Sequence, residues 1–151
     1  MKKFLSLLFI LTLLLGFIGL SRFDHTSDLS TETTINENGT YLNKDDVALY
    51  IHTFHKLPAN YLTKKQASAK GWKENTSYVG DLCESCALGG DRFANREGLL
   101  PGDQTYYECD VNYGGKKRNE QRLIYTSSGI VYYSDDHYNS FVLLYGAENE
   151  K

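Results

Sequence analysis

The chain has 151 residues, and 41% of them are hydrophobic, which is enough for one domain with a single core. Its formal net charge is −3, whereas proteins that bind nucleic acids are usually basic because their cations displace counterions from phosphates. The composition therefore argues against binding of nucleic acid through overall charge, and only a local cluster of cations could provide it.

The first 21 residues have the layout of a secretory signal peptide. Lys2 and Lys3 precede an apolar run that extends from Phe4 to Leu20. This run is at the lower limit of the length that spans a bilayer, so an uncleaved membrane anchor is the alternative. A cleaved signal would make the protein secreted and extracellular, and removal of the two lysines would make it more acidic.

Polar residues dominate the segment that follows the apolar run. Residues 22–41 are rich in Ser, Thr, Asp, Asn and Glu, and such a segment cannot bury enough apolar surface to offset the entropy of ordering it. We therefore expect a disordered leader or propeptide at 22–41, one folded domain at 42–146 and a polar tail at 147–151.

The three cysteines are an odd number for an exported protein. Cys83 and Cys86 are close enough in sequence to form a disulfide, which leaves Cys109 alone. A zinc site would need two further ligands, and no second pair of Cys or His residues has suitable spacing. The favoured interpretation is a structural disulfide with no metal site, and free thiols are the main alternative.

Local signals predict two helices in the first half of the domain. Asn43 is a suitable N-cap, acidic residues follow it, and apolar residues recur at helical spacing as far as Phe54. Pro58 prevents continuation. Residues 63–66 (TKKQ) have the sequence of a capping box, which predicts a second helix that ends before Gly71.

The second half of the domain has the pattern of strands, after a short third helix expected near residues 78–83. Segments rich in Tyr, Val, Ile and Leu alternate with glycine-containing turns. They cover residues 106–113, 122–127, 130–134 and 140–145. Helices followed by closely spaced strands predict an α+β fold with an antiparallel sheet.

Polar residues share one face of the strand predicted at 106–113. Because side chains alternate along a strand, Tyr106, Glu108, Asp110 and Asn112 lie on the same side. Two carboxylates and an amide on one strand face indicate either a solvated surface or a site. The residue pattern alone leaves both interpretations open.

Cations gather in the hairpin that follows this strand. Lys116, Lys117, Arg118 and Arg122 come directly after a Gly-Gly turn, and arginine is suited to bidentate contacts with phosphate. His137 lies in a turn between two predicted strands, where a single histidine is more often exposed to solvent than catalytic. These features indicate a small exported domain and do not decide whether its sheet carries a site.

Seven segments stand out in order along nearly the whole domain, from about Asp45 to Phe141. They are 50–61 (YIHTFHKLPANY), 89–91 (GGD), 93–98 (FANREG), 100–102 (LPG), 110–113 (DVNY), 118–119 (RN) with Arg122, and 136–138 (DHY). In this order they resemble the barnase-like, guanyl-preferring microbial ribonucleases. One such motif would be weak, but several in register are specific.

The resemblance implies a fold, an activity and a partner. The fold consists of N-terminal helices packed on a five-stranded antiparallel sheet. The activity is cleavage of single-stranded RNA after guanosine, without a metal or other cofactor, through a 2′,3′-cyclic phosphate that water opens to a 3′-phosphate. An intracellular inhibitor of the barstar type would protect the producing cell, and the enzyme would act as a monomer.

The resemblance also implies roles for individual residues. Glu108 matches the general base and His137 matches the general acid. Lys64, Arg118 and Arg122 match the groups that stabilise the charged transition state, and Asp110 would orient the arginines. The residues expected to contact the substrate base or its phosphate are Asn95, Arg96, Glu97 and Tyr138.

Two other functions are compatible with the same fold. The first is a module that binds RNA or protein without catalysis, although such a module has no reason to keep Glu108 and His137 together. The second is an antibacterial ribonuclease toxin that is membrane-anchored or delivered, with the same catalytic chemistry.

Overall fold

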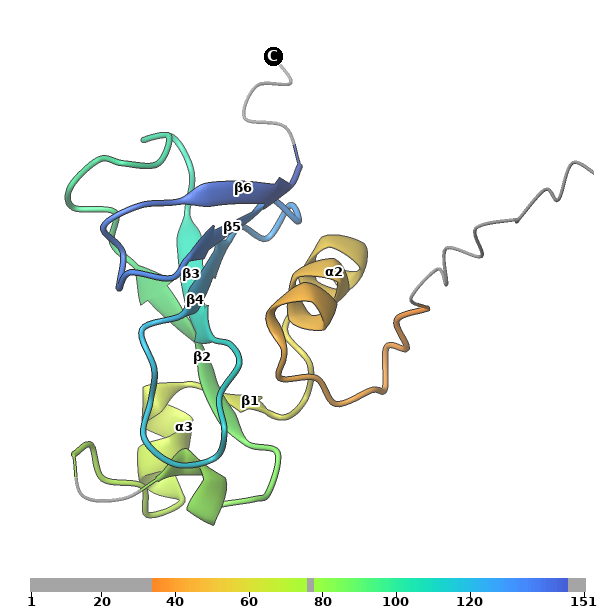
Figure 1. The fold of residues 1–151 in the computed structure, drawn as a ribbon, viewed down its shortest axis with the longest axis vertical. Helices are drawn as coiled ribbons and strands as arrows, with labels where there is room; N and C mark the ends of the chain where they lie inside the picture. The colour runs from red at the N-terminus through yellow and green to blue at the C-terminus, as the bar shows by residue number, and fades with distance from the viewer. Residues whose placement is uncertain (1–33, 76–77, 147–151) are drawn as a thin grey trace, which may run out of the picture. The chain divides into compact units, whose positions relative to one another are not determined.

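The computed structural model describes residues 34–75 and 78–146 (Figure 1). The signal peptide, most of the leader and the polar tail predicted from the sequence lie outside these ranges. The elements of the described part are α2 (Lys44–Phe54), β1 (Tyr61–Leu62), α3 (Lys64–Ala69), the 3-10 helix η1 (Val79–Asp81), β2 (Ala87–Phe93), β3 (Tyr106–Asp110), β4 (Arg122–Tyr125), β5 (Val131–Ser134) and β6 (Val142–Tyr145). Within the same ranges, no helix has the length and apolar character needed to cross a membrane.

Both predicted α-helices begin at their predicted caps. The Asn43 side chain accepts a hydrogen bond of 2.9 Å from the backbone N–H of Asp46 at the start of α2. At the start of α3, Thr63 and Gln66 form the reciprocal bonds of a capping box. Gly71 follows α3 with a φ of 99°, the left-handed conformation that glycine adopts without strain.

The sheet confirms the α+β fold and differs slightly in its number of strands. In the described part of the chain it has six strands, in the spatial order β1-β2-β3-β4-β5-β6. Each strand from β2 to β5 pairs antiparallel with the strand that follows it, so β2 to β6 form the expected five-stranded antiparallel sheet. The additional strand, β1, is only two residues long and pairs with β2 in parallel.

The hydrophobic pattern did not indicate β2 because glycines interrupt it. A Cβ atom added to Gly89 would lie 2.5 Å from the Cβ of Cys109, so no side chain fits between β2 and the core there. The pairing of β2 with β3 shifts register between Gly89 and Asp91, and Gly90 lies in this irregularity with a φ of 92°. Close packing, rather than strand propensity, determines the residues at these positions.

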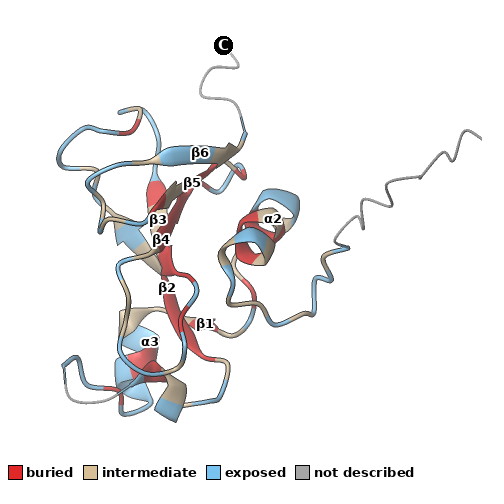
Figure 2. Cartoon of the chain, in the orientation of Figure 1, coloured by how far each residue is buried: buried red, intermediate tan, exposed pale blue. Residues whose placement is uncertain are grey.

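Apolar residues pack on both faces of the sheet. The larger cluster joins α2 and α3 to one face and includes Val47, Ile51 and Leu123. A smaller cluster on the opposite face contains Leu100, Tyr106, Ile124 and Tyr132. Figure 2 shows buried residues along the central strands and on the side of α2 that faces them. The face that carries Glu108 is therefore partly covered, rather than open to solvent along its whole length.

Residues 34–41, which the sequence analysis assigned to a disordered leader, pack against α2. The Tyr50 hydroxyl donates a hydrogen bond of 2.7 Å to the backbone carbonyl of Glu37, and Lys56 Nζ lies 2.7 Å from the Glu37 carboxylate. The ring centroids of Tyr41 and Tyr50 are 5.8 Å apart. These contacts show that α2 supplies partners for residues 34–41 that the polar composition of the leader does not reveal.

The cysteines are arranged as the sequence analysis favoured. Cys83 and Cys86 form a disulfide across a Cα–Cα distance of 5.2 Å. Cys109 is a free thiol with 1% of its surface exposed. It lies on the core face of β3, between the sheet and the helices.

Candidate active site

Glu108 lies in the middle of β3 and is the centre of the candidate site. Its side chain is only 15% exposed. The Tyr138 hydroxyl donates a hydrogen bond of 2.7 Å to Glu108 Oε2, and Lys64 Nζ lies 3.7 Å from Oε1. The carboxylate is therefore enclosed between a phenol and an ammonium group, rather than exposed on an open face.

The short strand β1 explains how a lysine from a helix reaches this carboxylate. Parallel pairing of β1 with β2 brings the first residue of α3, Lys64, to the edge of the site. The backbone N–H of Lys64 donates a hydrogen bond of 2.9 Å to Asp91 Oδ2, and Asp91 on β2 is paired with Glu108 on β3. Lys64, Asp91, Glu108, Asp110 and Arg118 line the same small depression.

Asp110 holds two arginines beside Glu108. Its carboxylate is 3% exposed and accepts hydrogen bonds of 2.7 and 2.8 Å from Nε and Nη2 of Arg118. This paired carboxylate raises the pKa of Arg118. Arg122 Nε lies 3.0 Å from Asp110 Oδ1 without the alignment of a hydrogen bond, so that contact is electrostatic.

Arg122 is buried almost completely and is held at the start of β4. Its side chain is 3% exposed. One of its terminal nitrogens, Nη1, donates to the backbone carbonyls of Asn119 and Gln121 at 2.8 and 2.7 Å. Because backbone atoms and a carboxylate fix the guanidinium, its orientation is set before any ligand binds.

A turn between β5 and β6 presents His137 and Tyr138. Both residues have positive φ angles, 56° and 75°. The Asp136 carboxylate holds this turn by accepting hydrogen bonds from the Ser134 hydroxyl at 2.9 Å, the Ser140 hydroxyl at 2.7 Å, and the backbone N–H groups of Asn139 and Ser140 at 3.0 Å. These bonds, the one from the Ser140 hydroxyl above all, lower the pKa of Asp136 to about 2.

Tyr138 connects this turn to the centre of the site. Its ring stacks on Phe93 at a centroid distance of 5.3 Å and lies 4.9 Å from the ring of His137. Burial, followed by the hydrogen bond to Glu108, raises the pKa of its hydroxyl. Tyr138 thus contacts both Glu108 and the exposed His137, and those two residues form no hydrogen bond or ion pair with each other within the described ranges.

The loop expected to read the base follows β2 and lies near the beginning of β3, where Phe93 pairs with Tyr106. Asn95 has a φ of 45°, and its side chain closes the loop through hydrogen bonds of 2.8 Å to the carbonyl and 3.1 Å from the N–H of Leu100. Its amide is therefore engaged in holding the loop. Arg96 and Glu97 are exposed, which leaves their side chains accessible to a ligand.

Two contacts of the site were not anticipated from the sequence. One is the hydrogen bond from Tyr138 to Glu108, which depends on how the turn between β5 and β6 lies relative to β3 and has no local signal. The other is the set of bonds to Asp136, for which a signal exists. The carboxylate is surrounded by Ser134, Asn139 and Ser140, and short polar residues at such offsets are typical of a turn closed by a side chain.

The groups of the candidate site are those of an enzyme that acts on phosphate esters. An enclosed carboxylate, two fixed guanidinium groups, an ammonium group and an accessible imidazole lie on or beside one sheet of an α+β domain. Together these groups can transfer protons and stabilise negative charge on a phosphate ester. No group of three or more His, Cys, Asp or Glu side chains in residues 34–75 and 78–146 is placed to hold a metal ion.

Comparison with known proteins identifies the family. A family model of ribonucleases matches residues 44–145. Ribonucleases of Bacillus intermedius and Bacillus pumilus are each 42% identical over 118 residues, which cover 77% of this chain and 69% of theirs. A ribonuclease of Heyndrickxia coagulans is 42% identical over 99 residues, 64% of this chain and 91% of its own. The chain belongs to the ribonuclease family, as a barnase-like microbial member, and is an RNA-cleaving enzyme.

Proposed function

We propose that the protein is a secreted endoribonuclease that cleaves single-stranded RNA preferentially after guanosine, without a metal or other cofactor. The observation that carries the proposal is the position of Glu108 between Lys64 and the arginines held by Asp110. A carboxylate in this place can accept a proton while the neighbouring cations stabilise a phosphate.

The first step is a transesterification. Glu108 removes the proton of the 2′-hydroxyl, whose oxygen attacks the adjacent phosphorus and forms a 2′,3′-cyclic phosphate. His137 protonates the departing 5′-oxygen. Lys64, Arg118 and Arg122 stabilise the negative charge that develops on the phosphoryl oxygens, and the fixed arginines need no reorganisation for this.

The second step uses the same two groups in exchanged roles. His137 removes a proton from water, which attacks the cyclic phosphate, and Glu108 returns a proton to the 2′-oxygen. The product is a 3′-phosphate. The Tyr138 hydroxyl donates to Oε2 of Glu108, so the proton is assigned to Oε1, which lies 3.7 Å from Lys64 Nζ.

Preference for guanine is assigned to the loop at 95–97. A carboxylate there can accept hydrogen bonds from N1–H and the N2 amino group of guanine, a donor pair that adenine lacks. The exposed Glu97 supplies that carboxylate, and the bonds between Asn95 and Leu100 hold the loop in shape before a base arrives.

The test compares Glu108→Ala and His137→Ala with the wild type on the dinucleotide GpA and on a 2′,3′-cyclic guanosine phosphate. Both variants should lose activity on both substrates, by about 100- to 10,000-fold for each proton transfer removed. Glu120→Ala, which removes an exposed carboxylate, is the matched control. A folded His137→Ala variant with near-normal rates, or loss of wild-type activity in EDTA, would contradict the mechanism.

Guanine preference and secretion need separate measurements. Glu97→Ala should reduce the ratio of rates on GpA and ApA without lowering stability. Equal wild-type rates on the two dinucleotides would remove the guanine assignment. Sequencing the N-terminus of protein recovered from the medium distinguishes a secreted enzyme from an anchored one.

A further inference from the structure

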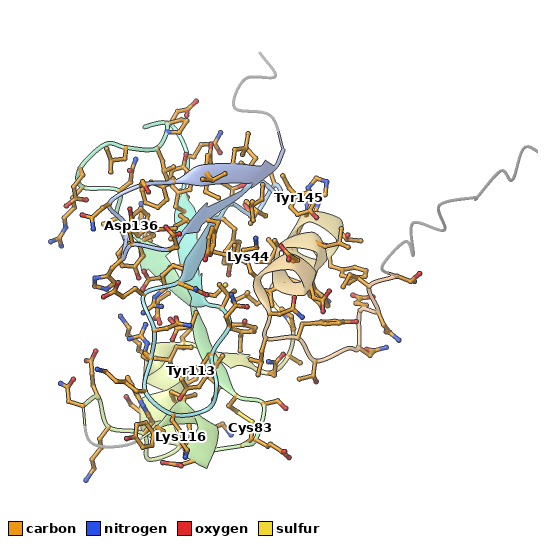
Figure 3. All side chains as sticks on the ribbon, in the orientation of Figure 1. Lys44, Cys83, Tyr113, Lys116, Asp136 and Tyr145 are labelled. Atoms are coloured by element: carbon orange, nitrogen blue, oxygen red, sulfur yellow. A yellow bond between two sulfur atoms is a disulfide. The ribbon has the colours of Figure 1, made fainter. Side chains whose placement is uncertain are left out.

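The Cys83–Cys86 bridge has no role in the chemistry described above. It joins residues three positions apart in the loop between η1 and β2, and the backbone N–H of Cys86 donates a hydrogen bond of 3.0 Å to the carbonyl of Cys83. Figure 3 shows Cys83 toward the end of the domain that carries Lys116, away from Asp136. The bridge therefore lies apart from the turn that presents His137.

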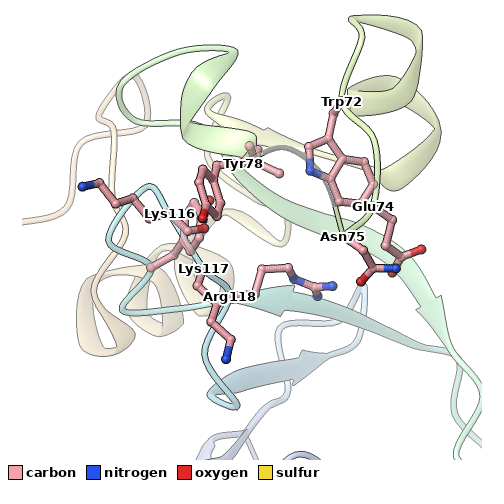
Figure 4. A pocket seen from close by; sticks show the side chains of 9 residues that line it. Trp72, Glu74, Asn75, Tyr78, Lys116, Lys117 and Arg118 are labelled. Atoms are coloured by element: carbon pink, nitrogen blue, oxygen red, sulfur yellow. The ribbon is translucent and has the colours of Figure 1, made fainter.

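The bridge is also separate from the cavity beside Arg118. η1 packs directly on the Gly-Gly turn of the hairpin, since no Cβ atom fits between Gly80 and the carbonyl oxygen of Gly115. The cavity between these walls is lined by residues that include Tyr78, Lys116 and Arg118, and it adjoins the candidate active site (Figure 4). Neither cysteine lines it, so a change at the bridge leaves the groups that face the cavity unaltered.

The two cysteines of the bridge differ in their accessibility. Cys83 is exposed, whereas Cys86 is 7% exposed and belongs to the core cluster together with Ala87 and Leu88. Thiol–disulfide exchange requires a thiolate to reach the sulfur that it attacks, so its rate depends on access. Cys83 therefore offers the sulfur that a reagent can attack, and Cys86 supplies the sulfur that leaves.

Hydrogen bonds that involve neither sulfur hold this loop in shape. Asn60 Nδ2 donates to the carbonyl of Ser85 at 2.8 Å, and the carbonyl of Asn60 accepts from the N–H of Ala87 at 3.2 Å. Together with the bond from Cys86 to Cys83, these contacts tie the loop to the sheet. After reduction the two thiols therefore stay close, and closing the bridge again is an intramolecular step between groups already in place.

Opening the bridge leaves the fold in place. In the chain-entropy model a disulfide stabilises a protein by closing a loop in the unfolded chain, and its contribution falls as that loop shortens. Because Cys83 and Cys86 are only three positions apart, most of the stability of the domain comes from its core. Exchange can therefore proceed in the folded protein.

The third cysteine is excluded from this exchange. Cys109 is 1% exposed and packs directly on Gly89 of β2. Burial raises the pKa of its thiol well above the usual value, so Cys109 holds little thiolate, the form that attacks disulfides. In the folded protein the exchange is therefore confined to Cys83 and Cys86.

We propose that the bridge is a thiol-exchange site, at which a low-molecular-weight thiol attacks Cys83 Sγ and Cys86 is the leaving and resolving thiol. The attacking sulfur bonds to Cys83 Sγ as the S–S bond breaks, and the electron pair of that bond goes to Cys86 Sγ, which takes a proton from water. Cys86 then attacks Cys83 Sγ and expels the external thiol, or it stays reduced while a second thiol attacks the external sulfur. The second route oxidises two thiols to one disulfide and delivers two electrons to the bridge.

Such a site makes the state of the bridge follow the thiol–disulfide balance of the surroundings, while the groups of the candidate active site stay in place. The reverse steps, with a low-molecular-weight disulfide as the oxidant, close the bridge in a chain that has already folded. The inference does not depend on the proposed function, because its chemistry uses none of the residues assigned to RNA cleavage.

Trapping a mixed disulfide tests which cysteine is accessible. Cys86→Ser leaves Cys83 as an exposed thiol, and Cys83→Ser leaves Cys86 as a buried one. When the folded full chain is treated with glutathione disulfide, Cys83→Ser should acquire glutathione at least about tenfold more slowly than Cys86→Ser, because the rate depends on access to the sulfur. Mass spectrometry of peptides should locate the adduct of Cys86→Ser on Cys83. Equal rates in the two folded variants would overturn the proposal.

The double variant Cys83→Ser/Cys86→Ser is the matched control. It retains only Cys109, so its reaction with glutathione disulfide measures modification that occurs through unfolding. That rate should be at least as low as the rate of Cys83→Ser. An adduct on Cys109 in the folded double variant, formed as fast as the adduct of Cys86→Ser, would overturn the confinement of exchange to the bridge.

Reduction and reclosure of the wild type test the role of Cys86. Treatment with 2-mercaptoethanol without denaturant, followed by alkylation, should label Cys83 and Cys86 but not Cys109, while the fluorescence of Trp72, the only tryptophan, shows that the domain stays folded. After removal of the thiol, glutathione disulfide should re-form the bridge without a retained adduct, whereas Cys86→Ser should keep its adduct. Reduction that needs denaturant, or glutathione retained by the wild type, would overturn the proposal.

Discussion

Replacement of Asp110 by alanine is expected to destabilise the protein severely. The carboxylate is 3% exposed and is the shared partner of Arg118 and of Arg122, whose side chain is also 3% exposed. Without this carboxylate, the buried guanidinium of Arg122 has no negatively charged partner. Breaking a buried ion pair in this way costs about 3–5 kcal/mol, and we expect the free energy of unfolding to fall by that amount.

Urea denaturation provides the assay. Glu37→Ala removes the carboxylate of an ion pair whose two side chains are each 55% exposed, and such surface pairs contribute about 0–1 kcal/mol. Asp110→Ala/Arg122→Met should be more stable than Asp110→Ala alone, because the unpaired buried charge is gone. A cost for Asp110→Ala no larger than that of Glu37→Ala, or no recovery in the double variant, would refute this reasoning.

Three further predictions follow from single contacts. The bonds to Asp136 lower its pKa to about 2. They therefore stabilise the fold above the unfolded pKa near 4, and this stabilisation is lost as the pH falls through 2. In urea denaturation from pH 6 to pH 2, the stability difference between wild type and Asp136→Asn should shrink only below about pH 4. Cys83→Ser/Cys86→Ser should lower the free energy of unfolding by about 2 kcal/mol with activity retained, and loss of activity in the folded variant would show a further role for the bridge. Gly80→Ala should cost about 1–3 kcal/mol through overpacking, whereas Gly102→Ala, which has open space around it, should be nearly neutral in the same thermal melt.

The helices were predictable because their signals are local. Asn43 and the capping box at 63–66 determine where α2 and α3 begin, and neither depends on distant parts of the chain. The alternation of residues likewise located the strands β3 to β6. The pattern did not predict β2, because glycine has no preference for strand structure. Gly89 is required there by its close contact with Cys109.

The members of the candidate site were proposed from the family resemblance, whereas its geometry came only from the structure. Family resemblance selected Glu108 and His137 as the acid–base pair, and their catalytic roles remain predictions. No sequence signal indicated that Tyr138 would lie between them and donate a hydrogen bond to the carboxylate. The sequence analysis did not predict the packing of residues 34–41 on α2, because a polar composition does not show which partners another element offers.

The spatial order of the strands has a consequence for folding kinetics. Every strand of the sheet lies next to its neighbour in the chain, so each antiparallel pairing from β2 to β6 closes only a short loop and costs little entropy. The exception is α2, at the beginning of the domain, which packs on β4, β5 and β6 near its end. Topologies with mostly local contacts fold fast, and the docking of α2 onto the assembled hairpins is the contact with the largest separation along the chain. That docking is therefore the step in which we expect most of the entropic barrier to reside.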